Sequence, residues 1–342
     1  MLNVGIIGLG SMGKLHLLNA MRIDNIKVVA AADKSETNRK SVEKYRLKTY
    51  DDYTKLIDAE DLDAVIISLP NFLKKECVFY AAEKNLDIFL EKPMALNYAE
   101  AKEIVQKAEK ENVRITVGVN YRYYPCVQKL KSNFDDGRIG DAVIATSDLV
   151  LSGPLSHGAI PRPVPEWWLN KETAGGGALI DLGYHLIDIF SWMFGDLDVT
   201  YSNLGYRLNL PVEDSAIVVL KSRVQGITCL VNAGWFSKSV FPDFNFRINI
   251  HGTSGYDSTD KYSPRDPRVH AIKAGMQNIF RRIVFKKPHY LSYTYYYSSY
   301  YKILDLFFET VKHATEPPIS LKKELDVIRL IDTVYNQQSV NR

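Results

Sequence analysis

Apolar residues over the first 120 positions follow two alternating patterns. Short continuous apolar runs, typical of strands covered on both faces of a parallel sheet, alternate with stretches in which apolar residues recur every three to four positions, as in helices. The runs predict strands over 2–7, 27–32, 64–69, 87–90 and 114–119. The periodic stretches predict helices over 11–23, 36–46, 72–85 and 97–111, and a short helix after Asp51. Strands and helices that alternate in this way predict a doubly wound parallel sheet of the α/β class.

The pattern changes after about residue 123. A helix over 125–136 and a strand over 142–151 precede a loop over 152–174 that is rich in glycine and proline. Strand-like runs separated by turn residues then lie at 197–208, 214–221, 226–236 and 244–251. Helical spacing returns at 268–285, 298–314 and 321–338. This half of the chain predicts an α+β domain with a mainly antiparallel sheet.

The length of 342 residues is more than one compact core usually holds, so two domains are expected. The change of pattern places their boundary between 123 and 124. The last helices are equally able to pack back on the first domain.

Composition narrows the class of protein. The net charge of +3, from 43 basic and 40 acidic residues, argues against a nucleic-acid binder, which needs a strong basic excess. Cys77, Cys126 and Cys229 lie far apart, which predicts neither a disulfide framework nor a structural zinc site and fits a reducing compartment. No signal-peptide pattern and no apolar run of ~20 residues is present. A cytoplasmic protein without a transmembrane segment is therefore expected.

A glycine motif joins the first predicted strand to the first predicted helix. Gly8 permits a tight turn, Gly10 lets the backbone approach a pyrophosphate, and Gly13 allows close packing of the helix. Ser11 and Met12 begin the helix, where free amides and the helix dipole favour an anion. The position between strand and helix makes this a specific dinucleotide-binding signature.

An acid follows the glycine motif at the expected distance. Asp33 ends the second strand, where a carboxylate can accept hydrogen bonds from both ribose hydroxyls and would repel a 2′-phosphate. This favours NAD. The nearby cations Lys34, Arg39 and Lys40 leave NADP open, because they could hold a 2′-phosphate.

A carboxylate and an imidazole lie four residues apart in the predicted helix that follows Gly175-Gly176-Gly177. Helical spacing puts Asp181 and His185 on one face, where such a pair can hold and move a proton. On spacing alone, an ordinary helix acid and a buried core histidine remain the favoured interpretation. Asp188, three residues past His185, could equally orient the imidazole.

A lysine precedes a proline at the end of the strand 87–90. Proline biases Lys92 towards an extended conformation, which displays its side chain at the edge of the sheet where ligands bind. The ammonium could stabilise a developing alkoxide on a substrate. Taken alone, Lys92 is more simply a surface lysine at a strand end.

A series of motifs then appears in a characteristic order along the chain. The motifs are Gly8-x-Gly10-x-x-Gly13, Asp33, Pro70-Asn71, Glu91-Lys92-Pro93, Asn120-Tyr121-Arg122, Trp167, Gly175-Gly176-Gly177, Asp181-x-Gly183-x-His185 and Glu213-Asp214. The series resembles the Gfo/Idh/MocA family of sugar and polyol oxidoreductases, from residue 2 to about 255 and more loosely beyond. Glu-Lys-Pro together with the triple glycine and Asp-x-x-x-His is specific to that family.

The resemblance implies a Rossmann domain that binds NAD(P), over 1–123, and a domain for substrate binding and oligomerisation with an open-faced, mainly antiparallel sheet, over 124–342. It implies no metal, and a Lys92–Pro93 peptide that is often cis. Implied cofactor-binding residues beyond the glycine motif, Asp33 and Lys34 are Leu69, Pro70, Asn71, Glu91 and Lys92. Implied substrate-binding residues are Lys92, Asn120, Arg122, Trp167, Asp181 and His185. Lys74 departs from the pattern, because the family often has a histidine there.

The resemblance also implies a catalytic set of Lys92, Asp181 and His185. Hydride would pass from a secondary alcohol carbon of a sugar, nucleotide sugar or cyclic polyol to C4 of the nicotinamide and leave a ketone. His185 would take the hydroxyl proton, Asp181 would orient it, and Lys92 would hold the developing oxyanion. The alternative is a catalytically silent NAD-binding regulator of the same fold.

Two segments near the C-terminus have unusual composition. Residues 268–287 contain six cations and no acid, with apolar residues at helical spacing. A solvated basic helix is the favoured interpretation; contact with a substrate phosphate or with anionic lipid is also open. The tyrosine-rich segment 290–301 predicts core or subunit interface. An exposed sheet face seldom stays bare, so a homodimer or homotetramer is expected.

Overall fold

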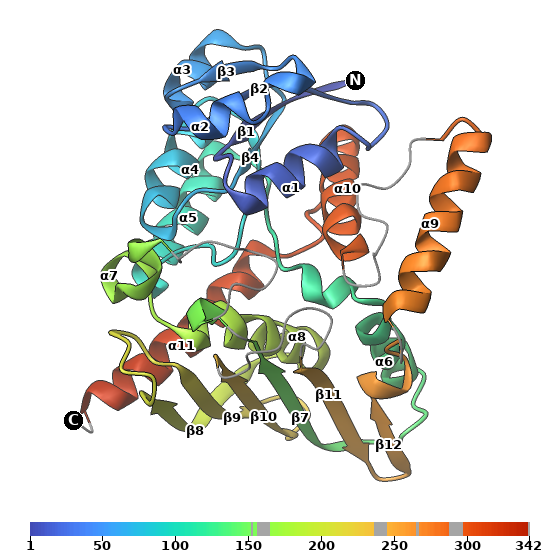
Figure 1. Cartoon of the computed structure of the whole chain (residues 1–342). Coiled ribbons are helices and arrows are strands. Elements are labelled where there is room, and N and C mark those ends of the chain that lie inside the picture. Colours follow the sequence, from blue (N-terminus) through green and yellow to red (C-terminus); the bar gives the residue numbers. More distant parts are fainter. Residues whose placement is uncertain (152, 156–164, 236–244, 265–266, 287–296, 341–342) are drawn as a thin grey trace. The chain divides into compact units, whose positions relative to one another are not determined.

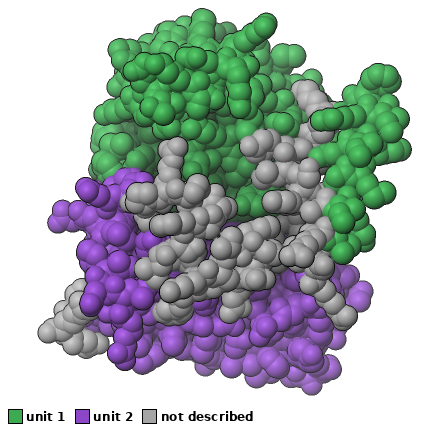
Figure 2. Space-filling view, viewed as in Figure 1, with its two compact units in different colours: residues 1–95, 99–120, 266–322 green, residues 96–98, 121–265, 323–342 purple. Residues whose placement is uncertain are grey.

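The structure is a computed structural model that describes residues 1–151, 153–155, 165–235, 245–264, 267–286 and 297–340. The chain forms two compact units, coloured separately in Figure 2. Unit 1 comprises residues 1–95, 99–120 and 266–322, and unit 2 comprises residues 96–98, 121–265 and 323–342. Each unit is therefore assembled from three separate stretches of the sequence.

Unit 1 contains a six-stranded parallel sheet in the order β3-β2-β1-β4-β5-β6 (Figure 1). The strands are β1 (Leu2–Ile7), β2 (Ile26–Ala32), β3 (Lys48–Tyr50), β4 (Ala64–Ile67), β5 (Asp87–Leu90) and β6 (Ile115–Val117). Its helices are α1 (Ser11–Ala20), α2 (Glu36–Lys40), α3 (Tyr53–Ala59), α4 (Lys74–Glu83), α5 (Tyr98–Glu111), α9 (Pro267–Ile283) and α10 (Ser298–His313). The order reverses between β1 and β4, which is the topology of a Rossmann fold. The predicted doubly wound sheet is confirmed.

The late helix α10 packs on α1 and on the end of the parallel sheet. The Asn120 amide donates a hydrogen bond to the Ser299 hydroxyl at 2.7 Å. Phe307 meets Phe89 of β5 edge to face, with ring centroids 5.7 Å apart. The described part of the tyrosine-rich segment includes Tyr300, whose ring contacts His16 of α1; the rest, 290–296, lies outside the described residues.

Unit 2 contains a six-stranded mixed sheet in the order β12-β11-β7-β10-β9-β8. The strands are β7 (Ala142–Val150), β8 (Leu197–Gly205), β9 (Ser215–Ser222), β10 (Thr228–Gly234), β11 (Asn245–Gly252) and β12 (Gly255–Ser258). Its helices are α6 (Pro125–Asp135), α7 (Lys171–Ala174), α8 (Tyr184–Phe194) and α11 (Leu321–Val340). Strands β7 and β10 are parallel and all other neighbouring pairs are antiparallel, as predicted.

The two faces of the second sheet differ. Helix α8 packs on β7 and β10, and the alternate residues Ala216, Val218 and Leu220 of β9 are buried on that face. On the other face Ile217 and Tyr201 are exposed. Period-two alternation of this kind marks a sheet with one covered and one open face.

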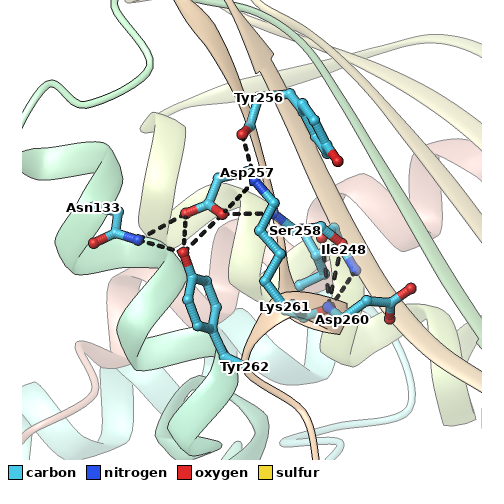
Figure 3. A network of polar contacts seen from close by, with 9 residues as sticks. Asn133, Ile248, Tyr256, Asp257, Ser258, Asp260, Lys261 and Tyr262 are labelled. Atoms are coloured by element: carbon cyan, nitrogen blue, oxygen red, sulfur yellow. Dashed lines mark hydrogen bonds and ion pairs between the residues drawn. The ribbon is translucent and has the colours of Figure 1, made fainter. Parts of the chain in front are cut away.

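A polar network holds α6 against the edge of the second sheet (Figure 3). The carboxylate of Asp257 in β12 accepts hydrogen bonds from the Asn133 amide and the Tyr262 hydroxyl, both at 2.9 Å. Lys261 donates to the Tyr256 carbonyl oxygen at 2.8 Å and lies 3.4 Å from the Asp257 carboxylate. The short edge strand is thus fixed by side chains, because four residues of ladder alone would hold it weakly.

Candidate active site

The glycine motif forms the turn between β1 and α1. Gly8 has a φ of +89°, and a Cβ there would overlap the Ser68 carbonyl, while a Cβ on Gly13 would overlap the carbonyl oxygen of Gly8. Nothing lies within 4 Å of the corresponding point at Gly10, so that side of the turn is open. The first turn of α1 has no side-chain cap and no acid, which leaves Ser11 and Met12 at an N-terminus suited to a pyrophosphate.

Asp33 is fixed in place by several donors. Its Oδ2 accepts from the Leu9 amide at 2.7 Å and from the Asn38 side chain at 3.2 Å, and its Oδ1 accepts from the Ser35 amide at 2.8 Å. These bonds keep the carboxylate beside the glycine turn, where a ribose would lie.

The cations that left NADP open have other partners. The Arg39 guanidinium donates to the carbonyl oxygens of Asp33 and Lys34 at 2.7 and 2.9 Å, and Lys40 pairs with Glu36 at 2.8 Å. Two of the three cations thus bind groups of their own segment. This arrangement fits NAD, and the residues of the turn fit a dinucleotide as a whole.

Leu69, Pro70 and Asn71 follow β4 directly, at the carboxyl end of the parallel sheet. Leu69 and Pro70 are half-buried, and Asn71, which begins a short 3₁₀ turn, is buried. Ligands of open α/β sheets bind beyond the carboxyl ends of the strands, so the place of these residues is compatible with a role in cofactor binding.

Glu91 is buried against the first helix. Its carboxylate lies 2.5 Å from Nε2 of His16, which is fully buried in α1. Burial raises the pKa of Glu91, but the hydrogen bond and charge of His16 and the charges of Lys74 and Lys92 outweigh burial and lower it. Glu91 is therefore tied to α1, the helix whose N-terminus follows the glycine turn. His16 was missed in the sequence, because its place on α1 gave no sign of a partner 75 residues away.

Lys74 is the second residue that the sequence did not assign. Its ammonium is fully buried and donates to the backbone carbonyl oxygens of Glu91, Lys92 and Pro93, at 2.8, 3.0 and 2.8 Å. Burial lowers the pKa of Lys74 to about 7. The Lys92–Pro93 peptide is cis, as predicted, and the half-buried Lys92 is displayed by this clamped turn.

The triple glycine lies in unit 2, just before the segment that carries Asp181 and His185. One oxygen of Glu213 accepts from the amides of Gly177 and Leu179 at 2.8 and 3.1 Å and from the Tyr335 hydroxyl at 2.7 Å. A Cβ on Gly176 would overlap the Tyr335 hydroxyl, and a Cβ on Gly177 would overlap the Glu213 carbonyl. Burial raises the pKa of Glu213 against the effect of these donors. Glycine is needed at these two positions because a side chain there would block the approach of Glu213 and Tyr335. Glu213 therefore caps the segment that begins at Gly177, and we call it the cap below.

The segment that carries Asp181 differs from the predicted α-helix. Residues Leu179–Gly183 form a π-helical turn, and α8 begins at Tyr184. The Asp181 carboxylate accepts a hydrogen bond from the indole Nε1 of Trp235 at 3.1 Å. Short π-helical turns are frequent at functional sites, because they offset the side chains of one turn from the next.

His185 lies one turn later and is nearly fully buried. Its ring stacks on Tyr121, with centroids 3.9 Å apart and planes 12° apart. Tyr121 in turn stacks on Tyr124 at 4.4 Å. The imidazole is therefore fixed by an aromatic column, which had no signal in the sequence beyond the presence of the tyrosines.

Arg122 and Asp188 bind each other. The guanidinium Nε donates to Asp188 at 2.8 Å, and Nη2 donates to Asp188 and to Glu324, the latter at 3.1 Å. All three side chains are buried, and burial together with the charge of Asp188 raises the pKa of Glu324 well above its usual range. Asp188 thus pairs with Arg122, and the Arg122 guanidinium is buried in this ion pair.

The remaining expected substrate residues belong to different units. Asn120, whose amide bonds to Ser299, is in unit 1 with Lys92. Trp167, in a 3₁₀ turn over Glu166–Leu169, is in unit 2 with Asp181 and His185. Among the described residues, no cluster of three or more potential metal ligands occurs.

Comparisons with known proteins agree with this geometry. Residues 2–119 match the family described as "Oxidoreductase family, NAD-binding Rossmann fold", and residues 127–256 match the "GFO/IDH/MocA C-terminal domain". Glucose-6-phosphate 3-dehydrogenase of Bacillus subtilis is 30% identical over 81% of this chain and 78% of its own length. Myo-inositol 2-dehydrogenase of Thermotoga maritima is 26% identical over 74% of each chain.

A solved structure shows the same fold over the whole chain. The WlbA dehydrogenase of Bordetella pertussis, in complex with NADH and UDP-GlcNAcA, matches with a TM-score of 0.82 at 18% identity and covers 100% of this chain and 96% of its own. The sequence motifs, the two sheets and the relatives lead to one conclusion. The chain belongs to the Gfo/Idh/MocA family of NAD-binding oxidoreductases.

Proposed function

We propose that this protein oxidises a secondary hydroxyl of a sugar, a nucleotide sugar or a cyclic polyol to a ketone, with NAD as hydride acceptor. The observation that carries the proposal is that Lys92, Asp181 and His185 are all present and each is held by neighbours. Lys74 clamps the turn of Lys92, and Trp235 binds Asp181. A silent member of the family would have no need of such supports.

Each of the three side chains has a distinct task in the proposed reaction. His185 takes the hydroxyl proton as the alkoxide forms, and Asp181 orients the hydroxyl. Lys92 stabilises the negative charge that develops on the oxygen. NAD, when bound, supplies the electrophilic C4 that accepts the hydride, so that proton, hydride and carbonyl product balance. Residues 1–123 would bind NAD and the rest of the chain the substrate.

The Rossmann turn supports NAD over NADP. Asp33 holds a carboxylate where a 2′-phosphate would lie, and Arg39 is engaged with backbone carbonyls. A phosphate there would face the Asp33 carboxylate, and among the described residues only Lys34 of the three nearby cations is not engaged with its own segment. The choice between the two cofactors is tested by the Asp33 variant described in the Discussion.

Turnover assays with matched variants test the catalytic proposal. NADH formation is followed with glucose 6-phosphate, myo-inositol and UDP-N-acetylglucosamine, because the relatives act on or bind molecules of these three classes. We expect Lys92→Met and His185→Ala to lower kcat on the active compound by at least ~100-fold. The controls are Lys102→Met and His313→Ala, at exposed positions outside the site.

The outcome separates the two functions. Tight NAD binding with no turnover of any compound would favour the catalytically silent regulator. Full activity of either site variant would refute the assigned roles, even if the protein were an active dehydrogenase. NAD affinity within threefold of wild type in His185→Ala would show that the loss lies in proton transfer.

We further propose that the open face of the second sheet joins copies of the chain into a dimer or tetramer. Apolar side chains such as Ile217, Ile144 and Tyr201 are exposed on that face or its edge. Exposed apolar side chains on a sheet face can be covered by a partner subunit.

A further inference from the structure

Helix α9 turns its apolar side outward. The residues Val269, Ile272, Met276, Ile279, Phe280 and Ile283 recur every three or four positions and so form one stripe. All six are exposed, with 65% of Ile272, 65% of Met276 and 67% of Ile283 accessible. A helix of a globular protein normally buries such a stripe, so the arrangement requires a partner outside the described residues.

The opposite side of α9 is polar and faces the protein more closely. Asn278 and Arg281 are half-buried, whereas the stripe is not. The charge of Arg281 also acts on Tyr301 of α10, where it opposes the rise in the phenol pKa that burial causes. The helix therefore has its apolar and polar sides in the reverse of the usual orientation.

The cations of this helix border the apolar stripe. With 3.6 residues per turn, Lys273 falls at one border and Arg282 beyond the other. Both are exposed, as is Lys286 just past the helix. The residues 268–287 include no acid, so no charge within the segment neutralises these cations.

The end of the helix extends the same pattern. The helix ends at Ile283, and Phe285 adopts a left-handed φ of +56°. Its side chain is fully exposed, and Val284 beside it is also exposed. An aromatic ring fully in water next to Arg282 and Lys286 is typical of a residue that enters a lipid interface.

We propose that α9 and residues 284–286 dock this protein on the surface of an anionic membrane. The stripe would lie in the plane of the interface with its apolar side chains ~5–10 Å deep, and the bordering cations would meet lipid phosphates and carboxylates. Each such cation contributes about a fivefold gain in partitioning near an anionic surface. None of the helices of the described residues is long and apolar enough to cross a bilayer.

Charge selects the membrane over a second copy of the chain. Two α9 stripes placed face to face would bring the uncompensated cations of both helices together. Like charges at close approach oppose such pairing, whereas anionic headgroups neutralise the same cations.

Vesicle flotation with the full chain and bound NAD tests the proposal. The vesicles are phosphatidylcholine alone or with 30% phosphatidylserine, a ~30% anionic fraction that mimics an anionic leaflet. We expect at least tenfold stronger binding to the anionic vesicles and weakening by salt. The variant Ile272→Gln/Met276→Gln/Ile279→Gln removes the stripe, and Lys273→Gln/Arg282→Gln/Lys286→Gln removes the cations. Each should lose at least ~10-fold in binding.

Matched controls distinguish binding through α9 from non-specific adsorption to vesicles. Val224→Gln removes an exposed apolar side chain of unit 2, and Lys55→Gln/Lys84→Gln/Lys110→Gln removes three exposed cations elsewhere in unit 1. Both should bind vesicles as wild type does, and all variants should bind NAD equally. Equal binding to neutral vesicles, or wild-type binding by the stripe variant, would overturn the proposal. A lower oligomeric mass of the stripe variant would also overturn it, because α9 would then be a contact between copies.

Discussion

The imidazole of His185 stacks on the ring of Tyr121, with centroids 3.9 Å apart and planes tilted by 12°. The two residues come from separate helical segments of unit 2 and are both buried. A stacked ring restricts the imidazole to one plane and so limits the directions in which it can accept a proton.

Tyr121 should therefore act as a positioning residue. We expect Tyr121→Leu to lower kcat about five- to tenfold, since an aromatic pair contributes ~1 kcal/mol beyond its buried area. Tyr121→Phe keeps the ring and should stay within threefold. The pH profile of kcat/KM is the decisive measurement. A displaced imidazole would shift this profile along the pH axis, whereas a fold that is merely less stable would not. Equal loss in both variants would contradict a role for the stacked ring.

Lys74 should make the free energy of unfolding of this protein depend on pH. The buried amine has a pKa of about 7 in the folded protein and 10.5 in the unfolded chain. Between these values the unfolded chain binds more protons, so the stability contributed by this group rises with pH. The free energy of unfolding of wild type relative to Lys74→Met should increase by ~1.4 kcal/mol for each pH unit above about 7.

Chemical denaturation at pH 7 and pH 9 measures this difference. Lys75→Met is the control, because Lys75 is adjacent and partly exposed. A difference between wild type and Lys74→Met that stays constant over this range would show that Lys74 keeps its proton in the folded state.

Asp33 should set the cofactor preference. Asp33→Ala removes the carboxylate that would bind the ribose and repel a 2′-phosphate, and it also frees the Leu9 amide. We expect the Kd of NAD to rise ~10–100-fold and the ratio of kcat/KM for NAD over NADP to fall at least tenfold. Asp51→Ala, at an exposed acid paired with Lys55, serves as control. An unchanged ratio would rule out Asp33 as the discriminating group.

Ile217 should be part of a subunit contact. We expect wild type to be a dimer or tetramer by light scattering and Ile217→Glu to shift the mass towards the monomer, because a charge would be buried in an apolar interface. Val224→Glu introduces the same charge at an exposed turn position away from the open face and should not change the mass. A monomeric wild type would contradict the proposed assembly.

The central strands of the parallel sheet could be predicted from local pattern because they are buried on both faces. All four residues of β4 are inaccessible, so the sequence there is a pure apolar run. The edge strands β3 and β12 were missed, because both are partly exposed and neither contains a continuous apolar run. The membership of 266–322 in unit 1 depends on contacts such as Asn120 with Ser299, which no local pattern reveals.

The candidate site residues could be named from the sequence, but the contacts that support them could not. Asp181 and His185 were assigned by the resemblance to a family, since their spacing alone favoured an ordinary acid and a core histidine, and the π-helical turn that carries Asp181 was not predicted. That turn depends on the cap by Glu213 and on Gly183, where a Cβ would lie 2.8 Å from the Leu179 side chain. Lys74 was visible only as a departure from a family pattern, because its three acceptors are backbone atoms that every residue has.

The hydrogen bonds between Glu213 and residues 177–179 also determine when the nascent chain can finish folding. The hydrogen bonds of the Glu213 carboxylate include one from the Tyr335 hydroxyl, and Tyr335 lies 122 positions later in the chain. Unit 1 likewise needs Ser299 long after Asn120 has left the ribosome. Neither unit can finish folding until these later residues have been synthesised, so a nascent chain would expose its glycine-rich segment until Tyr335 has emerged. Chaperone engagement late in synthesis, rather than domain-by-domain folding, is the regime that this connectivity favours.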